Sequence, residues 1–201
     1  MKRQKEHSTA AETKEKILSL ALEQSSKFGL EGLTIGKLAQ GLGMSKSGLF
    51  GHFGSKERLQ IEVLNHVALR FTHDVLLPAF KEPRGLPRIK ALASLWVQWS
   101  QTGFQGGCPI AAAVMEFDDR PGPVRDQLLK LMKQQHQTLV KLAEVTIQAG
   151  DFSPSTDPEQ FAFEVSAIML GFHQSYRFLE DKDVHLRLER AFDALIQRFS
   201  P

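Results

Sequence analysis

Residues 34–58 gather side chains whose chemistry suits a nucleic acid. Hydroxyl, imidazole and ammonium groups at helix ends can donate hydrogen bonds to phosphate oxygens, and Thr34, Ser45, His52 and Lys56 are our candidates for that positioning role. Lys46 is the candidate base reader, because a lysine ammonium can donate to guanine O6 and N7. For His52, a packed histidine is an equally good interpretation. The stretch therefore predicts a surface that contacts DNA.

Small and polar residues surround these candidates. Ser47 and the backbone at Gly48 can come close to a base edge, and Lys37 can reach a base or a phosphate. Glycine at positions 36, 48 and 51 leaves few side chains for direct reading of bases. We therefore expect much of the sequence preference to come from the shape of the DNA.

The same stretch carries the signals of two short helices joined by a tight turn. Thr34 can cap the first helix, Gly43 suits a left-handed backbone after it, and Ser45 can cap the second. The apolar positions that would face the core are Ile35, Leu38, Ala39, Leu42, Met44 and Leu49. This pattern predicts a helix-turn-helix, which presents its second helix to a major groove. The alternative is an ordinary helical hairpin of a bundle.

The stretch resembles the DNA-binding domain of the TetR family of bacterial repressors. The residues that carry the resemblance are Thr34, Leu38-Ala39, Gly43-Met44-Ser45, Leu49-Phe50-Gly51-His52-Phe53 and Lys56. The likeness extends to about residue 60. Phe50 stands where the family usually has a tyrosine that binds a phosphate, so the resemblance places Phe50 at the DNA while removing one hydrogen bond.

Composition fits a protein of this kind. Of 201 residues, 25 are Lys or Arg and 23 are Asp or Glu, and residues 1–60 hold an excess of basic side chains. The single cysteine, Cys108, excludes an internal disulfide and fits a reducing compartment. The longest apolar run, residues 110–115, is far shorter than the roughly 20 residues that a bilayer span requires. We expect a cytoplasmic protein with no membrane segment.

Apolar periodicity predicts an all-α fold of about nine helices without a convincing strand. The expected helices begin near Thr9, Thr34, Ser45, Ser55, Leu86, Cys108, Pro123, Asp157 and Asp183. The helix from Ser55 should end at Pro78, and Asp157 and Asp183 should cap the last two helices. We predict a three-helix DNA-binding domain over residues 1–55, joined through the fourth helix to a ligand-binding and dimerisation domain over 56–201.

Aromatic residues of the second domain favour a small-ligand site, because such sites are largely apolar with a few polar groups. The candidate set is Trp96, Trp99, Phe104, Cys108, Met115, Phe117, His136, Phe172, His173 and Tyr176. Each aromatic residue could instead belong to the core, and it is the resemblance that favours a pocket. Cys108 could sense oxidants or electrophiles, or could be a small buried apolar residue.

The helices over 157–179 and 183–199 are apolar on more than one face. This excess suggests that they pair with the same helices of a second copy in a four-helix bundle. The alternative is burial of both within one subunit. The resemblance implies a homodimer and a mechanism in which a small molecule shifts the fourth helix and changes the separation of two recognition helices.

The expected function is a DNA-binding regulator, a repressor that a small molecule releases from its double-stranded operator. No Gly-x-Ser-x-Gly, phosphate loop or histidine pair at ligand spacing occurs in the sequence, so we expect no enzyme activity, catalytic residue, metal site or cofactor. The rival interpretation is a helical interaction module that no longer binds DNA.

Overall fold

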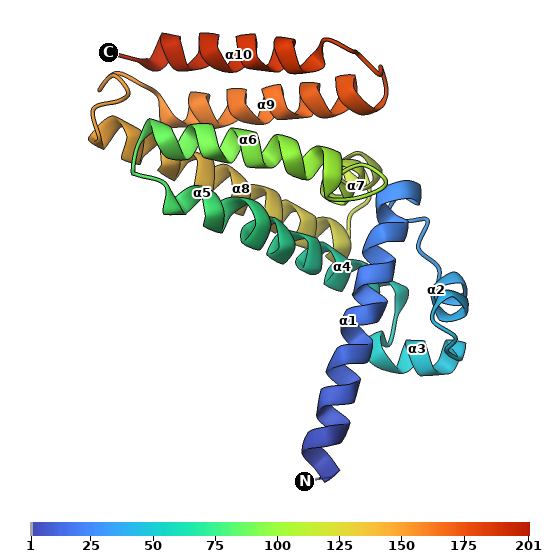
Figure 1. Ribbon diagram of the computed structural model, residues 1–201. Helices are drawn as coiled ribbons and strands as arrows, with labels where there is room; N and C mark the ends of the chain where they lie inside the picture. Colours follow the sequence, from blue (N-terminus) through green and yellow to red (C-terminus); the bar gives the residue numbers. More distant parts are fainter. Residues whose placement is uncertain (1) are drawn as a thin grey trace. The chain divides into compact units, whose positions relative to one another are not determined.

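The computed structural model describes residues 2–201, with side chains from residue 10 onward. All elements in this range are helical: α1 (Lys2–Phe28), α2 (Ile35–Gly41), α3 (Lys46–Phe53), α4 (Lys56–Phe71), η1 (Thr72–Leu76), α5 (Leu77–Lys81), α6 (Leu86–Thr102), α7 (Pro109–Phe117), α8 (Pro123–Gln148), α9 (Pro158–Arg177) and α10 (Val184–Phe199) (Figure 1). Because α4, η1 and α5 follow one another in sequence without a break, they count as one helix. The described residues then hold nine helices, and the predicted all-α fold is confirmed.

Tertiary contacts divide the chain into two compact units. Unit 1 comprises Met1–Arg70 and Phe104–Leu129, and unit 2 comprises Phe71–Gly103 and Lys130–Pro201. Helix α7 therefore belongs to the same unit as α1, α2 and α3. The predicted domain boundary after residue 55 stays a prediction.

Helices α1 to α4 of unit 1 meet around a small apolar core. Ile17 and Leu22 of α1, Leu38 of α2, Leu49 of α3 and Leu64 of α4 are all fully buried. The buried apolar positions of α1 are 17, 18, 21 and 22, and those of α4 are 59, 63, 64 and 67. Such three- and four-residue spacings put one face of a helix against its neighbours. The core thereby fixes which faces of α2 and α3 remain exposed.

The helix starts in this region are capped as predicted. The Thr34 side chain accepts a hydrogen bond from the Lys37 N–H at 3.3 Å, and the Ser45 hydroxyl accepts one from the Gly48 N–H at 3.0 Å. Gly43 has a φ of 63°, the left-handed backbone expected for the turn. Local sequence signals therefore account for the helix-turn-helix.

Helix α1 is longer at its N-terminus than predicted. It begins at Lys2, whereas the expected start was Thr9, whose side chain lies outside the described residues. Residues 2–8 contain no glycine or proline, the two residue types that oppose a helix most strongly. A capping pattern in the sequence therefore does not by itself show where a helix begins.

Pro78 does not end the fourth helix, which was the prediction. The helix continues to Lys81, and the preceding turn, η1, widens into a π-helix in which the Leu77 N–H bonds to the Thr72 carbonyl. Proline has no N–H for the carbonyl four residues back, and its ring would clash with that carbonyl. A π turn just before Pro78 accommodates both effects.

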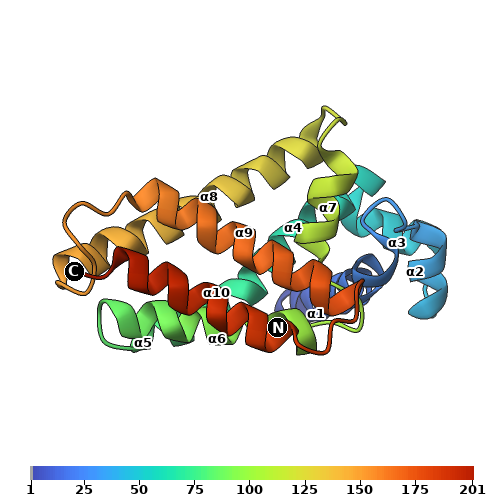
Figure 2. The same cartoon turned by 90° about the horizontal axis from the view of Figure 1, so that it is seen from above.

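Unit 2 contains α5, α6, α9, α10 and the later part of α8. Helices α9 and α10 run side by side in both views (Figures 1 and 2). Phe161 of α9 and Phe199 of α10 form a ring cluster with Phe152, with centroids 5.4 to 5.9 Å apart. Tilted and edge-on ring pairs of this kind stabilise a core beyond the area that they bury.

The two predicted caps of unit 2 differ. Asp157 caps α9, because its carboxylate accepts the N–H groups of Glu159 and Gln160. Asp183 occupies the N-cap position of α10 but makes no capping bond with its side chain. Asp181 instead accepts the Asp183 N–H at 2.9 Å and pairs with Arg187 at 2.7 Å.

Among the residues that the structure describes, no helix combines the length and apolar character needed to cross a bilayer.

Candidate nucleic-acid interface and effector region

The exposed face of α3 carries the candidate base-reading residues. Lys46, Ser47, Gly48 and Phe50 are exposed, and His52 is partly buried with its ring tilted against Phe53. On the opposite face, Leu49 and Phe53 anchor the helix in the core. The helix therefore presents a polar and cationic surface while its apolar side chains hold it in place.

Lys46 lies across the first turn of α2, a contact that the sequence did not reveal. A Cβ atom placed on Gly36 would be 3.3 Å from Lys46 Cε and 3.8 Å from its Nζ. Gly36, which the sequence analysis treated only as a missing contact, therefore makes room for the lysine side chain. The Lys46 side chain can therefore pass over the start of α2.

The start of α3 uses some of its polar groups internally. The Gly48 N–H is taken by Ser45, whose hydroxyl also lies 3.2 Å from the hydroxyl of Ser47. The N–H of Gly48 is thus already satisfied within the protein, although its lack of a side chain still allows a close approach. The two serine hydroxyls keep further hydrogen-bonding capacity for an external partner.

Lys37 and Thr34 lie at the start of α2. Both are exposed, and the Lys37 ammonium lies 5.9 Å from the centre of the Phe28 ring. Phe28 is 68% exposed although it is large and apolar. A cation held over an aromatic face is partly restrained, so Phe28 helps to orient Lys37. The sequence alone does not reveal this contact.

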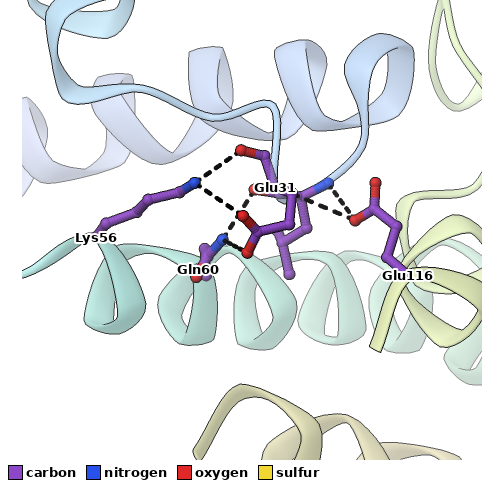
Figure 3. A network of polar contacts seen from close by, with 5 residues as sticks. Glu31, Lys56, Gln60 and Glu116 are labelled. Atoms are coloured by element: carbon purple, nitrogen blue, oxygen red, sulfur yellow. Dashed lines mark hydrogen bonds and ion pairs between the residues drawn. The ribbon is translucent and has the colours of Figure 1, made fainter. Parts of the chain in front are cut away.

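Lys56 is engaged within the protein (Figure 3). Its ammonium donates to the Glu31 carbonyl at 2.7 Å and to the Glu31 carboxylate at 3.2 Å. Gln60 donates to the same carboxylate at 3.2 Å and to the Leu30 carbonyl at 3.0 Å. An ammonium has three N–H donors, so one remains for a phosphate. Lys56 therefore acts first as a brace for the turn between α1 and α2.

The electrostatics of this brace favour an ionised Glu31. Burial raises the pKa of Glu31, but hydrogen bonds from Gln60 and Lys56 outweigh that effect and hold the pKa below its ordinary value. Neither Glu31 nor Gln60 was among the residues singled out from the sequence. Each lies far along the chain from its partners, and only the fold brings them together.

The candidate effector residues fall into the two units. Phe104, Cys108, Met115 and Phe117 belong to unit 1, and Trp96, Trp99, His136, Phe172, His173 and Tyr176 belong to unit 2. In unit 1, Phe104 and Phe117 are buried, whereas Met115 is 63% exposed. Cys108 is the N-cap of α7 and partly exposed. Its predicted position at a helix start is confirmed.

The aromatic residues of unit 2 pack closely against one another. Trp96 and Trp99 both meet the Phe71 ring edge-on, at 5.4 and 5.6 Å. Phe172 and Tyr176 stack at 5.8 Å with nearly parallel rings. Ring pairs of this kind are typical of a filled core.

The two candidate histidines of unit 2 differ in their surroundings. His136 pairs with the Glu159 carboxylate at 2.6 Å and is partly exposed on α8. His173 is half-buried on α9, and burial, reinforced by the nearby charge of Arg177, lowers the pKa of its imidazole. His173 thus combines an apolar setting with a titratable group, whereas His136 makes an ion pair or hydrogen bond near the surface.

A small cavity lies inside unit 2. Its volume is about 10 Å³, room for about one water molecule. The residues that line it are Ile89, Leu92, Ala93, Trp96, Leu139, Leu142, Phe161, Val165 and Phe192. Only Trp96 belongs to the candidate set. Typical small-molecule sites have volumes of about 300 to 1,000 Å³, so this cavity is too small for such a molecule.

Two segments of the sequence match known protein families. Residues 17–63 match the family described as bacterial regulatory proteins, tetR family, and residues 85–192 match the tetracyclin repressor-like C-terminal domain. The second match alone covers more than half of the chain. The chain belongs to the TetR family of transcriptional regulators.

Solved structures share the fold. A TetR transcriptional regulator from Chloroflexus aurantiacus J-10-FL has a TM-score of 0.83 at 24% identity, with 94% of each chain covered. A TetR-family regulator from Cytophaga hutchinsonii has a TM-score of 0.82 at 20% identity, with 96% of each chain covered. AibR in complex with isovaleryl coenzyme A and operator DNA has a TM-score of 0.67 at 21% identity, covering 92% of this chain and 98% of its own. No curated protein matches the chain significantly.

Family membership defines the general function. The protein is a DNA-binding transcriptional regulator with a ligand-binding C-terminal domain, and regulators of this family are not enzymes. They bind operator DNA and small-molecule effectors.

Proposed function

We propose that the protein is a repressor that binds its operator through α3 and leaves it when a small molecule binds. The exposed face of α3 carries this proposal, because Lys46, Ser47 and Phe50 face outward from a helix that Leu49 and Phe53 fix in the core. The proposed DNA contacts are Thr34, Lys37, Ser45, Lys46, Ser47, Gly48, Phe50, His52 and Lys56. Lys46 reads a base, and Ser47 and Gly48 come close to a base edge. The phosphates are held by Thr34, Ser45, His52 and Lys56.

The proposed active form is a homodimer that pairs α9 and α10 with their counterparts in a second copy. Large apolar side chains are exposed on these helices: Phe163 by 65%, Leu170 by 46% and Leu186 by 46%. Phe163 and Leu170 lie seven residues apart, so they share one face of α9. Exposed apolar faces of this kind mark contact surfaces between proteins.

A dimer sets the spacing of its two recognition helices. Half-sites one helical turn apart, about 34 to 36 Å, fit only one separation. An effector that favours another separation by about 1 to 3 kcal/mol lowers operator occupancy about 5- to 150-fold. We infer that the effector acts in this way, in the cytoplasm, where bacterial operators are found.

The proposed effector site uses the candidate aromatic and histidine residues of the second domain, over residues 56–201. AibR was crystallised with both isovaleryl coenzyme A and operator DNA, which supports an effector that is a small organic molecule. The cavity lined by Trp96 is the starting point inside unit 2, and it must widen to admit such a molecule.

Binding to genomic DNA tests the proposal. Fragments that the purified protein retains from its source genome would supply the operator, whose affinity is then titrated at several salt concentrations. We expect log K to fall with log salt by about 0.9 for each phosphate contacted. Lys46→Ala should weaken operator binding by about 1 to 3 kcal/mol and relax the preference at one base pair.

The rival function, a helical interaction module without DNA binding, predicts a different result. Such a module would retain no fragment above background and would show no salt-dependent binding to any duplex. Retention of the same fragments by wild type and by Lys46→Ala with equal affinity would also argue against the proposed role of α3.

A further inference from the structure

Glu116 of α7 grips the turn between α1 and α2 (Figure 3). One of its carboxylate oxygens, Oε2, accepts the Leu30 N–H at 2.8 Å and the Glu31 N–H at 3.3 Å. These two amides follow directly after the end of α1. A carboxylate that receives two backbone N–H groups holds that backbone more firmly than a neutral acceptor does.

The turn itself is shaped to receive this carboxylate. Gly29 has a φ of 76°, which other residues rarely adopt, and a Cβ atom there would lie 1.6 Å from Glu116 Oε1. Glycine is therefore required at position 29 both for the backbone conformation and for the close approach of Glu116. Both the backbone of Gly29 and the side chain of Glu116 are therefore fitted to this contact.

A second contact ties the same part of the chain to the end of α1. The Gly106 and Gly107 N–H groups donate to the hydroxyl and the carbonyl of Ser26, at 3.1 and 3.0 Å. A Cβ atom on Gly106 would lie 1.9 Å from the Ser26 carbonyl oxygen. The segment that leads into α7 and α7 itself thus hold α1 and the following turn at two points.

Helix α4 holds the opposite side of the turn. Lys56 and Gln60 bind the Glu31 carboxylate, and Gln60 also binds the Leu30 carbonyl. The side chains of Leu30 and Leu33 are buried. The turn is thereby fixed between α4 and α7, and its geometry sets where α2 begins.

We propose that Glu116 is a positioning residue for DNA binding. By fixing the Leu30 and Glu31 amides, it sets the start of α2 and hence the orientation of the α2 and α3 pair that faces DNA. This inference rests on the proposed DNA-reading role of α3. Glu116 itself makes no contact with DNA in this account, and it acts only through the backbone that it holds.

Three substitutions of Glu116 test separately the length of its side chain and its negative charge. Glu116→Gln keeps the length of the side chain and an oxygen that can accept both N–H groups, but removes the charge. Glu116→Asp keeps the charge but is one methylene too short to reach the amides. Glu116→Ala removes both. The matched control is Asp118→Ala, which removes a carboxylate that accepts the Asp119 N–H at 2.9 Å, away from the α1–α2 turn.

The experiment measures amide hydrogen exchange, operator affinity and thermal unfolding of each full-length variant. We expect Glu116→Ala and Glu116→Asp to speed exchange at Leu30 and Glu31 about tenfold and to weaken operator binding about tenfold, from the lost hydrogen bonds. Glu116→Gln should restore most of both. Asp118→Ala should match wild type in both, and the unfolding curves show whether each variant is folded.

Three outcomes would overturn the inference in distinguishable ways. If Glu116→Asp exchanges Leu30 and Glu31 faster but binds the operator like wild type, the grip exists but does not position the reading helices. If wild type itself binds no duplex, the proposed function fails and this inference fails with it. A folded Glu116→Asp with unchanged exchange at both amides would show that Glu116 does not hold the turn.

Discussion

At the scale of a single residue, Phe50 lacks only a hydroxyl group that a tyrosine would offer to DNA. Its ring is 48% exposed on the face of α3 proposed to meet DNA. Phe50→Tyr adds a hydroxyl that can reach a phosphate, which should strengthen operator binding by about 0.5 to 1.5 kcal/mol. A titration at fixed salt measures the change, with Phe80→Tyr on α5, whose side chain is also exposed, as control. Unchanged affinity would mean that the Phe50 ring points away from the phosphates.

Substitution of Gly36 should change the stability of α2 and the affinity for DNA in opposite directions. Gly36→Ala should stabilise α2 by about 0.5 to 1 kcal/mol, because alanine loses less backbone entropy in a helix. The new methyl group would press on Lys46, whose Cε lies 3.3 Å from that position. This would shift Lys46, the proposed base reader, so operator affinity should fall by about two- to fivefold. The loss is smaller than that of a full base contact, which is worth about 1 to 3 kcal/mol.

A double-mutant cycle tests that explanation. In a Lys46→Ala background, Gly36→Ala should keep its effect on chemical unfolding but lose its effect on operator affinity. An affinity loss of the same size in both backgrounds would show that Gly36 acts on DNA binding by another route.

The residue roles that could be predicted from sequence are the local ones. Thr34 and Ser45 cap helices through bonds to residues three positions away, so their type and spacing suffice. The pairing of Lys56 with Glu31 spans 25 positions, and that of Leu30 with Glu116 spans 86. Only tertiary packing creates such pairs, and a single sequence does not reveal it.

At the scale of elements, Pro78 shows a limit of pattern reasoning. Proline predicts a helix end, yet Val75 and Ala79 on either side of it are fully buried. Burial of these side chains stabilises a continuous helix. The π-helix of η1 accommodates the N–H group that Pro78 lacks. The boundary could not be predicted because tertiary packing outweighed the local preference.

Helix α9 should confer a pH dependence through His173. Its pKa lies below the ordinary 6.5 because burial, and then Arg177, disfavour the charged imidazole. As pH falls below about 6.5, the unfolded chain takes up this proton first, so the free energy of unfolding decreases until the folded-state pKa is passed. Above that range the contribution to stability is fully present.

Thermal unfolding across this pH range measures the effect. His173→Gln removes the titrating group, so the melting temperature of the variant should depend less on pH between neutral and mildly acidic conditions. Equal slopes for wild type and His173→Gln would contradict the assignment.

The whole molecule should depend on the exposed face of α9. Leu170→Glu would place a charge in the proposed dimer interface, where an unpaired charge is costly to bury. We expect the variant to become monomeric at micromolar concentration and to lose operator affinity, because two joined half-site contacts become single ones. Sedimentation and a DNA titration measure the two effects. Gln137→Glu, on an exposed position of α8, is the matched control and should change neither.

The overall architecture was largely predictable, whereas the candidate effector site was not. Repeating apolar faces, glycine turns and proline starts are local signals that specify nine helices. A pocket depends on the space left between side chains. Trp99 and Phe172 have the composition of a pocket wall, yet both are buried against other rings.

The cavity of unit 2, at about 10 Å³, is too small for an organic effector. We expect an effector that binds there to select a wider, open conformation, so that the observed dissociation constant is the intrinsic one divided by the fraction of molecules that are open. If one molecule in about a hundred is open, a well-fitting compound binds about a hundredfold more weakly than its fit would allow. Because this factor is the same for every compound that binds the open form, it weakens all of them without changing their ranking, and slow saturable association would identify binding through the open form.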